Sequence, residues 1–337
     1  MKTVLLLSGA AFAIAAVTAV LVTPFIQRLA THVGMFDELS ERRMHDAPRP
    51  RIGGIAVFLG FAFALFSTAG IAINLQRFGA SETHALLGLL FGATLILCIG
   101  LWDDVMSMRA RNKFVAQIAV ASILMLYGSD FRIQGVGLGH NHWIDFPLWL
   151  SIPLSLAWYL GMMNAINFID GLDGLLSGIT AISGTALFVI ALGKGHSVVA
   201  IVMVALVGAV IGFLPYNFNP ARIILGDSGA LFIGFIFAAA SVIGDTKQTV
   251  TISLVLPLLV LALPILDTAA TIVRRTRAGQ RITQADRGHF HHQLVFRFGL
   301  DVRQAVLLIY VVCFVLGATA VVLSGAIGGP LSAARIF

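Results

Sequence analysis

The sequence predicts an all-α, polytopic membrane protein. Of its 337 residues, 58% are hydrophobic and only 11% are charged, and the mean hydropathy is +0.94. A soluble globular protein carries about 25% charged residues. Apolar runs close to the roughly 20 residues that a bilayer-spanning helix needs recur along the whole chain. We therefore expect one integral-membrane domain over residues 1–337, without a sizeable soluble domain.

The apolar runs predict about ten membrane-spanning helices. In chain order they cover residues 4–27, 53–75, 85–102, 114–128, 147–163, 175–193, 197–216, 229–244, 250–272 and 304–324. The first run follows Lys2 and imitates a secretory signal, but it is long enough to span a bilayer, so we expect it to be retained. The runs 114–128 and 229–244 are the shortest.

Lysine and arginine residues set the expected orientation, because cytoplasmic loops carry an excess of them. One set of alternate connections holds 16 of the 22 basic residues; it consists of 28–52, 103–113, 164–174, 217–228 and 273–303. We therefore expect this set in the cytoplasm and both termini outside. Most of the carboxylates fall in the same connections, so one face of the membrane collects the acids and bases of a site.

The polar stretch from Asn164 to Gly174 lies between two long apolar runs. Two carboxamides and two carboxylates recur in it at every third residue, namely Asn164, Asn167, Asp170 and Asp173. If the stretch is helical, residues three apart are neighbours and can act together. A polar network that joins helices is the alternative. Four such residues at the aqueous rim favour a functional site.

Two acidic motifs flank other apolar runs on the same predicted side. Asp103 and Asp104 end a run, where a helix dipole disfavours acids, so a divalent cation or a cationic partner such as Lys113 explains them better. Asp227 follows Gly226 just before a new run. An N-cap role explains it alone, and ligation of a hard cation is the functional alternative.

Three histidines, His289, His291 and His292, lie in 273–303, the longest predicted cytoplasmic loop. Zinc is one interpretation, but no cysteine adjoins, and phosphate contact is at least as consistent with the neighbouring Asp and Arg. Acids for Mg²⁺, with Arg, Lys and His for phosphate oxygens, are what phosphoryl transfer requires. The residues therefore predict Mg²⁺-dependent chemistry on a phosphorylated or nucleotide substrate, with one partner in the lipid.

Five motifs, in this order and over nearly the full length, resemble the polyprenyl-phosphate N-acetylhexosamine-1-phosphate transferase family. They are Asp103-Asp104 with Lys113 and Gln117, Asn164-x-x-Asn167-x-x-Asp170-Gly-x-Asp173-Gly174, Asn217 with Pro220-Ala221, Gly226-Asp227-Ser228-Gly229, and His289-x-His291-His292. The segments 48–54 and 264–267 also look like family segments. Phe290 interrupts the histidines, which is similar to the branch that uses UDP-N-acetylglucosamine (UDP-GlcNAc). The branch that uses UDP-N-acetylmuramoyl-pentapeptide has three consecutive histidines.

The resemblance implies an enzyme of the bacterial inner membrane with its active site on the cytoplasmic face. It implies transfer of GlcNAc-1-phosphate from UDP-GlcNAc to undecaprenyl phosphate with release of UMP, as the first membrane step of a cell-surface glycan. The implied cofactor is Mg²⁺, with Mn²⁺ as an alternative. The implied partners are both substrates and the bilayer; a homodimer is allowed and no nucleic acid is expected. Another UDP-N-acetylhexosamine, carrying a 6-deoxy sugar or muramoyl-pentapeptide, and an ion-coupled transporter remain the alternatives.

Through the resemblance, each motif receives an expected role. Catalysis is expected of Asp103, Asp104, Asp170 and Asp173. Substrate binding is expected of Lys113, Asn164, Asn167, Asn217, His289, His291 and His292, and metal ligation of Asp227 and Asp103. Ile224 stands where family members often carry an aromatic that can stack on uracil, so weaker base stacking is expected. We prefer direct in-line attack over a phospho-aspartate, because the lipid phosphate is already a competent nucleophile.

Overall fold

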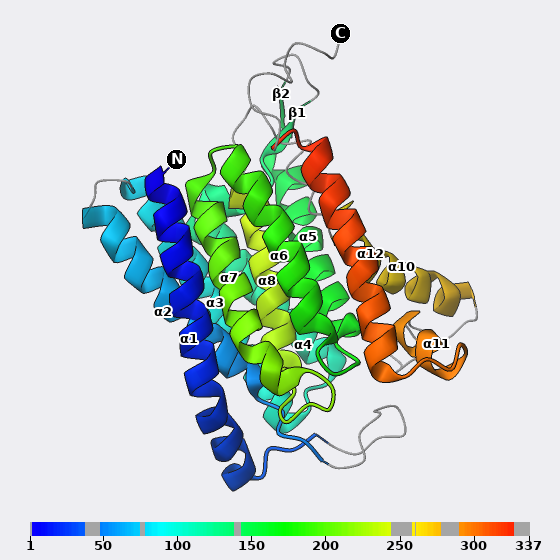
Figure 1. Ribbon diagram of the computed structural model, residues 1–337. Helices are drawn as coiled ribbons and strands as arrows, with labels where there is room; N and C mark the ends of the chain where they lie inside the picture. Colours follow the sequence, from blue (N-terminus) through cyan, green and yellow to red (C-terminus); the bar gives the residue numbers. More distant parts are fainter. Residues whose placement is uncertain are drawn as a thin grey trace.

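The computed structural model describes residues 2–37, 48–74, 78–137, 143–243, 258–259, 261–277 and 290–326, and it is a bundle of long helices (Figure 1). The first half contains α1 (Lys2–Val33), α2 (Gly53–Asn74), α3 (Ala80–Met106), α4 (Ala110–Tyr127), a 3₁₀ turn η1 (Ser129–Phe131), and strands β1 (Gly135–Gly137) and β2 (Trp143–Asp145). The second half contains α5 (Leu148–Ile169), α6 (Leu175–Gly193), α7 (Ser197–Asn217), α8 (Gly226–Ile243), α10 (Ala262–Arg277), α11 (Phe290–Phe296) and α12 (Val302–Leu323).

Within the described residues, 8 helices are long and apolar enough to cross a membrane: α1, α2, α3, α5, α6, α7, α8 and α12. The prediction of an all-α polytopic membrane protein is confirmed, with fewer qualifying spans than the ten expected. The run at 114–128 does form α4, but the helix begins four residues earlier and so includes Arg111 and Lys113. The run at 250–272 lies partly outside the described residues, and its last part belongs to α10, which ends in three arginines.

Helix α8 is the centre of the bundle. Every residue from Ser228 to Val242 is buried, because this helix is apolar on all faces and is covered by α3, α5 and α2. Helix α3 approaches its first turn closely, since a Cβ atom added at Gly100 would lie 2.7 Å from the Ser228 nitrogen. A glycine is therefore required at this crossing. The first turn of α8 is held rigidly between neighbours, and this turn carries Asp227.

The described parts of four connections meet at one end of the bundle, namely 34–37 with 48–52, 107–109, 170–174 and 218–225 (Figure 1). The start of α1 and the end of α12 lie at the opposite end, together with the antiparallel β1–β2 hairpin. As far as the structure describes them, four of the five connections expected on one side therefore share one end. That this end faces the cytoplasm, with both termini outside, stays a prediction.

The boundaries of two helices differ from expectation in a way that matters for the site. Helix α5 continues to Ile169, so Asn164 and Asn167 are helical residues and the connection shrinks to 170–174. Asp170 follows the helix as its C-cap, and Asp173 lies beyond it. The three-residue row of polar side chains therefore does not continue on one helix.

Candidate active site

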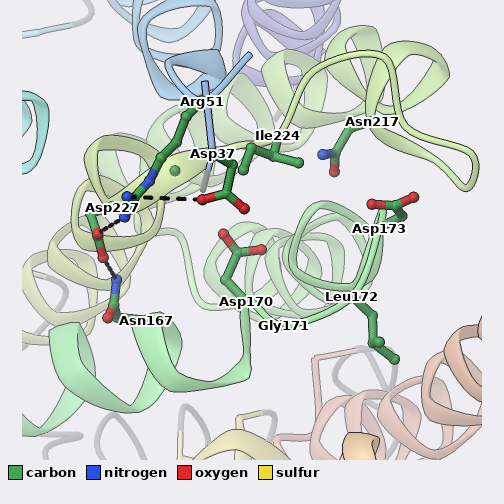
Figure 2. Close-up of a pocket in the computed structure, with 11 residues that line it drawn as sticks. Asp37, Arg51, Asn167, Asp170, Gly171, Leu172, Asp173, Asn217, Ile224 and Asp227 are labelled. Atoms are coloured by element: carbon green, nitrogen blue, oxygen red, sulfur yellow. Dashed lines mark hydrogen bonds and ion pairs between the residues drawn. The ribbon is translucent and has the colours of Figure 1, made fainter. Parts of the chain in front are cut away.

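A cavity of about 170 Å³ opens at the end of the bundle where the four connections meet. Its polar wall includes Asp37, Arg51, Asn167, Asp170 and Asp227, and Ile224 contributes an apolar side chain (Figure 2). The polar residues come from a loop, from the end of α5 and from the start of α8. The cavity thus joins segments that are far apart in the sequence.

Asp227 is held by donors from three other segments. Its Oδ1 accepts hydrogen bonds from Lys113 Nζ at 2.8 Å and from Asn167 Nδ2 at 2.6 Å. Its Oδ2 accepts from Arg51 Nη2, and Figure 2 shows Arg51 and Asn167 on opposite sides of the carboxylate. The structure therefore brings together three residues singled out from separate motifs, Asp227, Lys113 and Asn167, and adds Arg51 to them.

Asp104 caps the N-terminus of α8 from α3. Its Oδ1 accepts from the Asp227 backbone N–H at 2.7 Å and its Oδ2 from that of Ser228 at 2.9 Å. These N–H groups are the ones that a helix start leaves without an intrahelical partner, and the helix dipole favours an anion there. Gly226, with φ +77°, leaves room for the carboxylate, since a Cβ atom would lie 2.7 Å from Asp104 Oδ2. The cap that the sequence allows for Asp227 is thus supplied by Asp104, which frees Asp227 for other partners.

Arg51 ties these carboxylates together. Its Nε lies 2.9 Å from Asp104 Oδ1, its Nη1 lies 4.0 Å from Asp37 Oδ1, and its Nη2 pairs with Asp227. Burial alone lowers the pKa of Arg51, but attraction to Asp227, Asp104 and Asp103 outweighs it, so the pKa is raised above its ordinary value. Arg51 is therefore a permanent positive charge in the wall of the cavity.

The backbone around Arg51 explains how two arginines reach two different acids. Phe36 and Pro50 form an antiparallel bridge, and Ile224 N–H donates to the Pro50 carbonyl at 2.9 Å. In such an extended segment, residues two apart point to the same side. Arg49 and Arg51 therefore both face the site, where Arg49 pairs with Asp173 and Arg51 with Asp227.

Asp173 holds the loop that follows α5. Its Oδ2 accepts from Arg49 Nη1 at 2.6 Å, from Asn219 Nδ2 at 3.0 Å and from the Ala221 backbone N–H at 2.9 Å. The side chain is 0% exposed. Such a buried carboxylate with several donors joins the 170–174 and 218–221 connections, and it is placed to support the loop.

Asp170 has a different position. It lines the cavity and is half-buried, and its carboxylate points toward the cavity beside that of Asp37 (Figure 2). Asp173 lines the same cavity, but its side chain is buried and accepts three hydrogen bonds. Of the two acids, Asp170 is therefore the one placed to meet a substrate, while Asp173 fixes the loop that carries it.

The remaining expected site residues lie behind the cavity or at its edge. Lys113 Nζ also pairs with Asp103 Oδ2 at 2.7 Å, and the other oxygen of Asp103 accepts from the Met108 N–H at 2.7 Å. Asn164 donates to Gln117 Oε1 at 2.8 Å. Asn217 lines the cavity, but it accepts from Ser177 at 2.8 Å and donates to the Ile223 carbonyl at 3.1 Å. Asp103, Asn164 and Asn217 thus support the residues around them.

The histidine motif is only partly described. His289 lies outside the described residues, as do the side chains of His291 and His292, whose backbone belongs to the first turn of α11. The Phe290 N–H donates to Asp267 Oδ1 at 2.8 Å and so joins α11 to α10. The roles expected of the three histidines stay predictions.

Sequence reasoning missed Arg49, Arg51, Asp37 and Asn219 as site residues. A signal existed for the two arginines, because the segment Pro48-Arg-Pro-Arg-Ile-Gly53-Gly54 looks like a family segment. The segment alone gives neither arginine a distinct role, because an arginine in a basic loop is usually explained by membrane orientation.

The residues fit a divalent cation held mainly by its substrate. Within the described part of the chain, no group of three or more His, Cys, Asp or Glu side chains could hold a metal ion. Mg²⁺ is commonly bound by one or two carboxylates with substrate phosphates and water completing its shell. Asp227 and Asp170 supply such carboxylates in the cavity wall, where the acids outnumber the arginine, Arg51.

A bundle of membrane helices with carboxylates, an arginine and a lysine around a cavity at one end defines an integral-membrane enzyme for phosphorylated substrates. Residues 86–245 match the family model described as glycosyl transferase family 4. The chain is 35% identical over 317 residues to a probable undecaprenyl-phosphate N-acetylglucosaminyl 1-phosphate transferase of Bacillus subtilis, which covers 94% of this chain and 85% of the relative.

Two further relatives are similar to this chain over most of their length. The chain is 36% identical over 321 residues to a decaprenyl-phosphate N-acetylglucosaminephosphotransferase of Mycobacterium tuberculosis, covering 88% of this chain and 79% of the relative. It is 31% identical over 301 residues to a phospho-N-acetylmuramoyl-pentapeptide-transferase of Bacillus cytotoxicus, covering 86% of this chain and 89% of the relative. The chain belongs to the polyprenyl-phosphate N-acetylhexosamine-1-phosphate transferases of glycosyl transferase family 4, and the family expected from the five motifs is confirmed.

Proposed function

We propose that this multi-pass bacterial inner-membrane protein transfers GlcNAc-1-phosphate from UDP-GlcNAc to undecaprenyl phosphate and releases UMP. The observation that carries the proposal is the grouping of Asp227 with Lys113, Arg51 and Asn167 at a cavity between helix ends. The name of the relative from Bacillus subtilis supports the same reaction. The cavity end of the bundle faces the cytoplasm in this proposal, because the basic residues gather there.

In the proposed reaction, an oxygen of the lipid phosphate attacks the phosphorus that bears the sugar, and the bond to the UMP oxygen breaks. The lipid phosphate has a second pKa of about 6, so it is largely ionised at neutral pH and needs little help from a base. The protein's task is then to position two anions and to neutralise their charge. Direct attack follows, without a covalent intermediate on an aspartate.

Mg²⁺ is part of this proposal, with Mn²⁺ as an alternative ion. Asp227 would hold it, with Asp170 as the second candidate ligand, and it would supply neutralisation of charge on the diphosphate and on the leaving UMP. Asn167 orients the Asp227 carboxylate through its hydrogen bond of 2.6 Å. Lys113, anchored by Asp103, keeps a positive charge next to the same carboxylate.

The sugar is the finer part of the proposal. Phe290 interrupts the histidine motif, and the first relatives act on N-acetylglucosaminyl groups by name, which favours UDP-GlcNAc. A relative named for phospho-N-acetylmuramoyl-pentapeptide transfer is also similar, so UDP-N-acetylmuramoyl-pentapeptide is one alternative substrate. A 6-deoxy UDP-N-acetylhexosamine is the other.

A panel of UDP-sugars tests the proposal. Purified protein in lipid nanodiscs should release UMP from UDP-GlcNAc only when undecaprenyl phosphate and Mg²⁺ are both present. UMP release from UDP-N-acetylmuramoyl-pentapeptide or a 6-deoxy sugar instead would move the protein to the alternative substrate. No UMP from any sugar, with ion-dependent uptake into vesicles, would support the transporter reading and overturn the proposal.

A further inference from the structure

Arg51 pairs with the Asp227 oxygen that Lys113 and Asn167 leave unused. Its Nη2 pairs with Oδ2 of Asp227, while Oδ1 already accepts from Lys113 and Asn167. Three donors on one carboxylate leave little of it for a metal ion, since its two oxygens offer about four lone-pair sites. A divalent cation beside a guanidinium would also be strongly repelled unless an anion lay nearby. Metal ligation by Asp227 therefore requires one of its resident cations to move.

The geometry selects Arg51 as the cation that moves. Lys113 is fixed from behind by Asp103 Oδ2 at 2.7 Å, and it does not line the cavity. The Arg51 side chain does line the cavity and is 18% exposed. Its backbone is anchored on both sides, because the carbonyl of Pro50 and the N–H of Gly53 both bond to Ile224. A rotation of the side chain can thus release Asp227 without moving the loop.

The nucleotide's diphosphate offers Arg51 a replacement partner. A guanidinium presents a planar fork of donors that matches phosphate oxygens in pairs. Arg51 lines the cavity between two of its acids, with Asp227 on one side and Asp37 at 4.0 Å on the other. A diphosphate in the cavity would find this fork in the cavity wall. The divalent cation would then replace the positive charge of Arg51 beside Asp227.

We propose that Arg51 is a resident counter-cation of Asp227 that competes with the divalent metal and is transferred to the substrate diphosphate when the metal binds. Arg51 is then a positioning residue and a specificity element for nucleoside diphosphates, and metal and nucleotide bind cooperatively through it. This inference rests on the proposed function and on metal ligation by Asp227. It adds a consequence that a merely structural arginine would not have: removal of Arg51 tightens metal binding.

Direct Mn²⁺ titration tests this consequence. Free Mn²⁺ is followed by electron paramagnetic resonance with purified protein in nanodiscs, without nucleotide. Arg51→Gln should bind Mn²⁺ about tenfold more tightly than the unaltered chain, the size of a typical coupling between sites. Arg51→Lys keeps a charge but has no fork, so it should give a smaller gain. Arg109→Gln removes an exposed arginine near Lys113 and should leave Mn²⁺ affinity unchanged.

The outcomes separate this inference from the proposed function. Equal or weaker Mn²⁺ binding by Arg51→Gln overturns the competition, even where UMP release from UDP-GlcNAc stands. If Arg51→Gln does not fold, as judged by gel filtration and thermal melting, Arg51→Lys decides by the same criterion. An equal gain in Mn²⁺ affinity in Arg109→Gln would mean that any lost positive charge strengthens binding, and it would overturn the inference. Mn²⁺ binding by neither the unaltered chain nor any variant overturns it together with the metal role of Asp227.

Discussion

The carboxylate of Asp104 on α3 caps the helix that carries Asp227, accepting the Asp227 and Ser228 backbone N–H groups at 2.7 and 2.9 Å. Two acids that each resemble a catalytic residue in the sequence are thereby given different tasks. Asp104 fixes the start of α8, and Asp227 presents its carboxylate to Lys113, Arg51 and Asn167. The cap and the site are parts of one network.

Replacing Asp104 by Asn should lower stability and turnover together. The amide keeps the size of the side chain but loses the charge and turns one donor toward a backbone N–H. Loss of a helix cap costs about 0.5–2 kcal/mol, and we expect a lower melting temperature in nanodiscs with reduced UMP release. Asp301→Ala is the control, because Asp301 caps α12 by accepting from the Gln304 N–H at 2.8 Å and alanine removes this acceptor. The control should lower stability without a comparable loss of activity.

Substitutions of the two acids in the loop after α5 should have different effects on stability and activity. Asp170→Asn should leave the melting temperature close to that of the unaltered chain and reduce kcat by about 100-fold, the size of losing one electrostatic contact in the transition state. Asp173→Asn should instead lower the melting temperature, because three donors lose their charged partner. Thermal melting with UMP release measures both. Loss of folding in Asp170→Asn with a stable Asp173→Asn would reverse the assignment.

Lys113 and Asp103 should be energetically coupled. Lys113→Gln leaves Asp103 buried without its cation, and a single partner removed from a buried pair costs about 3–5 kcal/mol. The double variant Lys113→Gln with Asp103→Asn should recover part of this loss, with a coupling of about 0.5–3 kcal/mol in a double-mutant cycle. Chemical denaturation of the four proteins measures it. Strictly additive effects would show that the 2.7 Å contact contributes nothing to stability.

The helices and most of the site could be predicted from the sequence, because apolar runs and polar motifs leave local patterns. Asp227, Lys113 and Asn167 lie at or near helix ends, and the predicted membrane orientation puts these ends on the same side of the membrane. Their proximity could therefore be expected. The pairing of Arg51 with Asp227 could not, because 176 positions separate them and nothing local marks an arginine as a partner. The capping of α8 by Asp104 could not be predicted for the same reason, since 123 positions separate Asp104 from Asp227.

The choice between Asp170 and Asp173 also needed the structure. Their equal spacing and chemistry made them alternatives, and a helical row would have put both on related faces. The end of α5 at Ile169 breaks that row, and Arg49 then pairs with Asp173 alone of the two. Arg49 and Asp173 are 124 positions apart, so only tertiary contacts separate the roles.

The most direct test of the central claim is the lipid product formed by the unaltered protein and by Asp227→Asn. Both are purified in nanodiscs and incubated with UDP-GlcNAc, undecaprenyl phosphate and Mg²⁺, and the lipid fraction is analysed by mass spectrometry. The unaltered protein should form undecaprenyl-diphospho-GlcNAc with an equal amount of UMP, and a folded Asp227→Asn should form neither. Full product formation by Asp227→Asn, or no lipid product from the unaltered protein, would contradict the account.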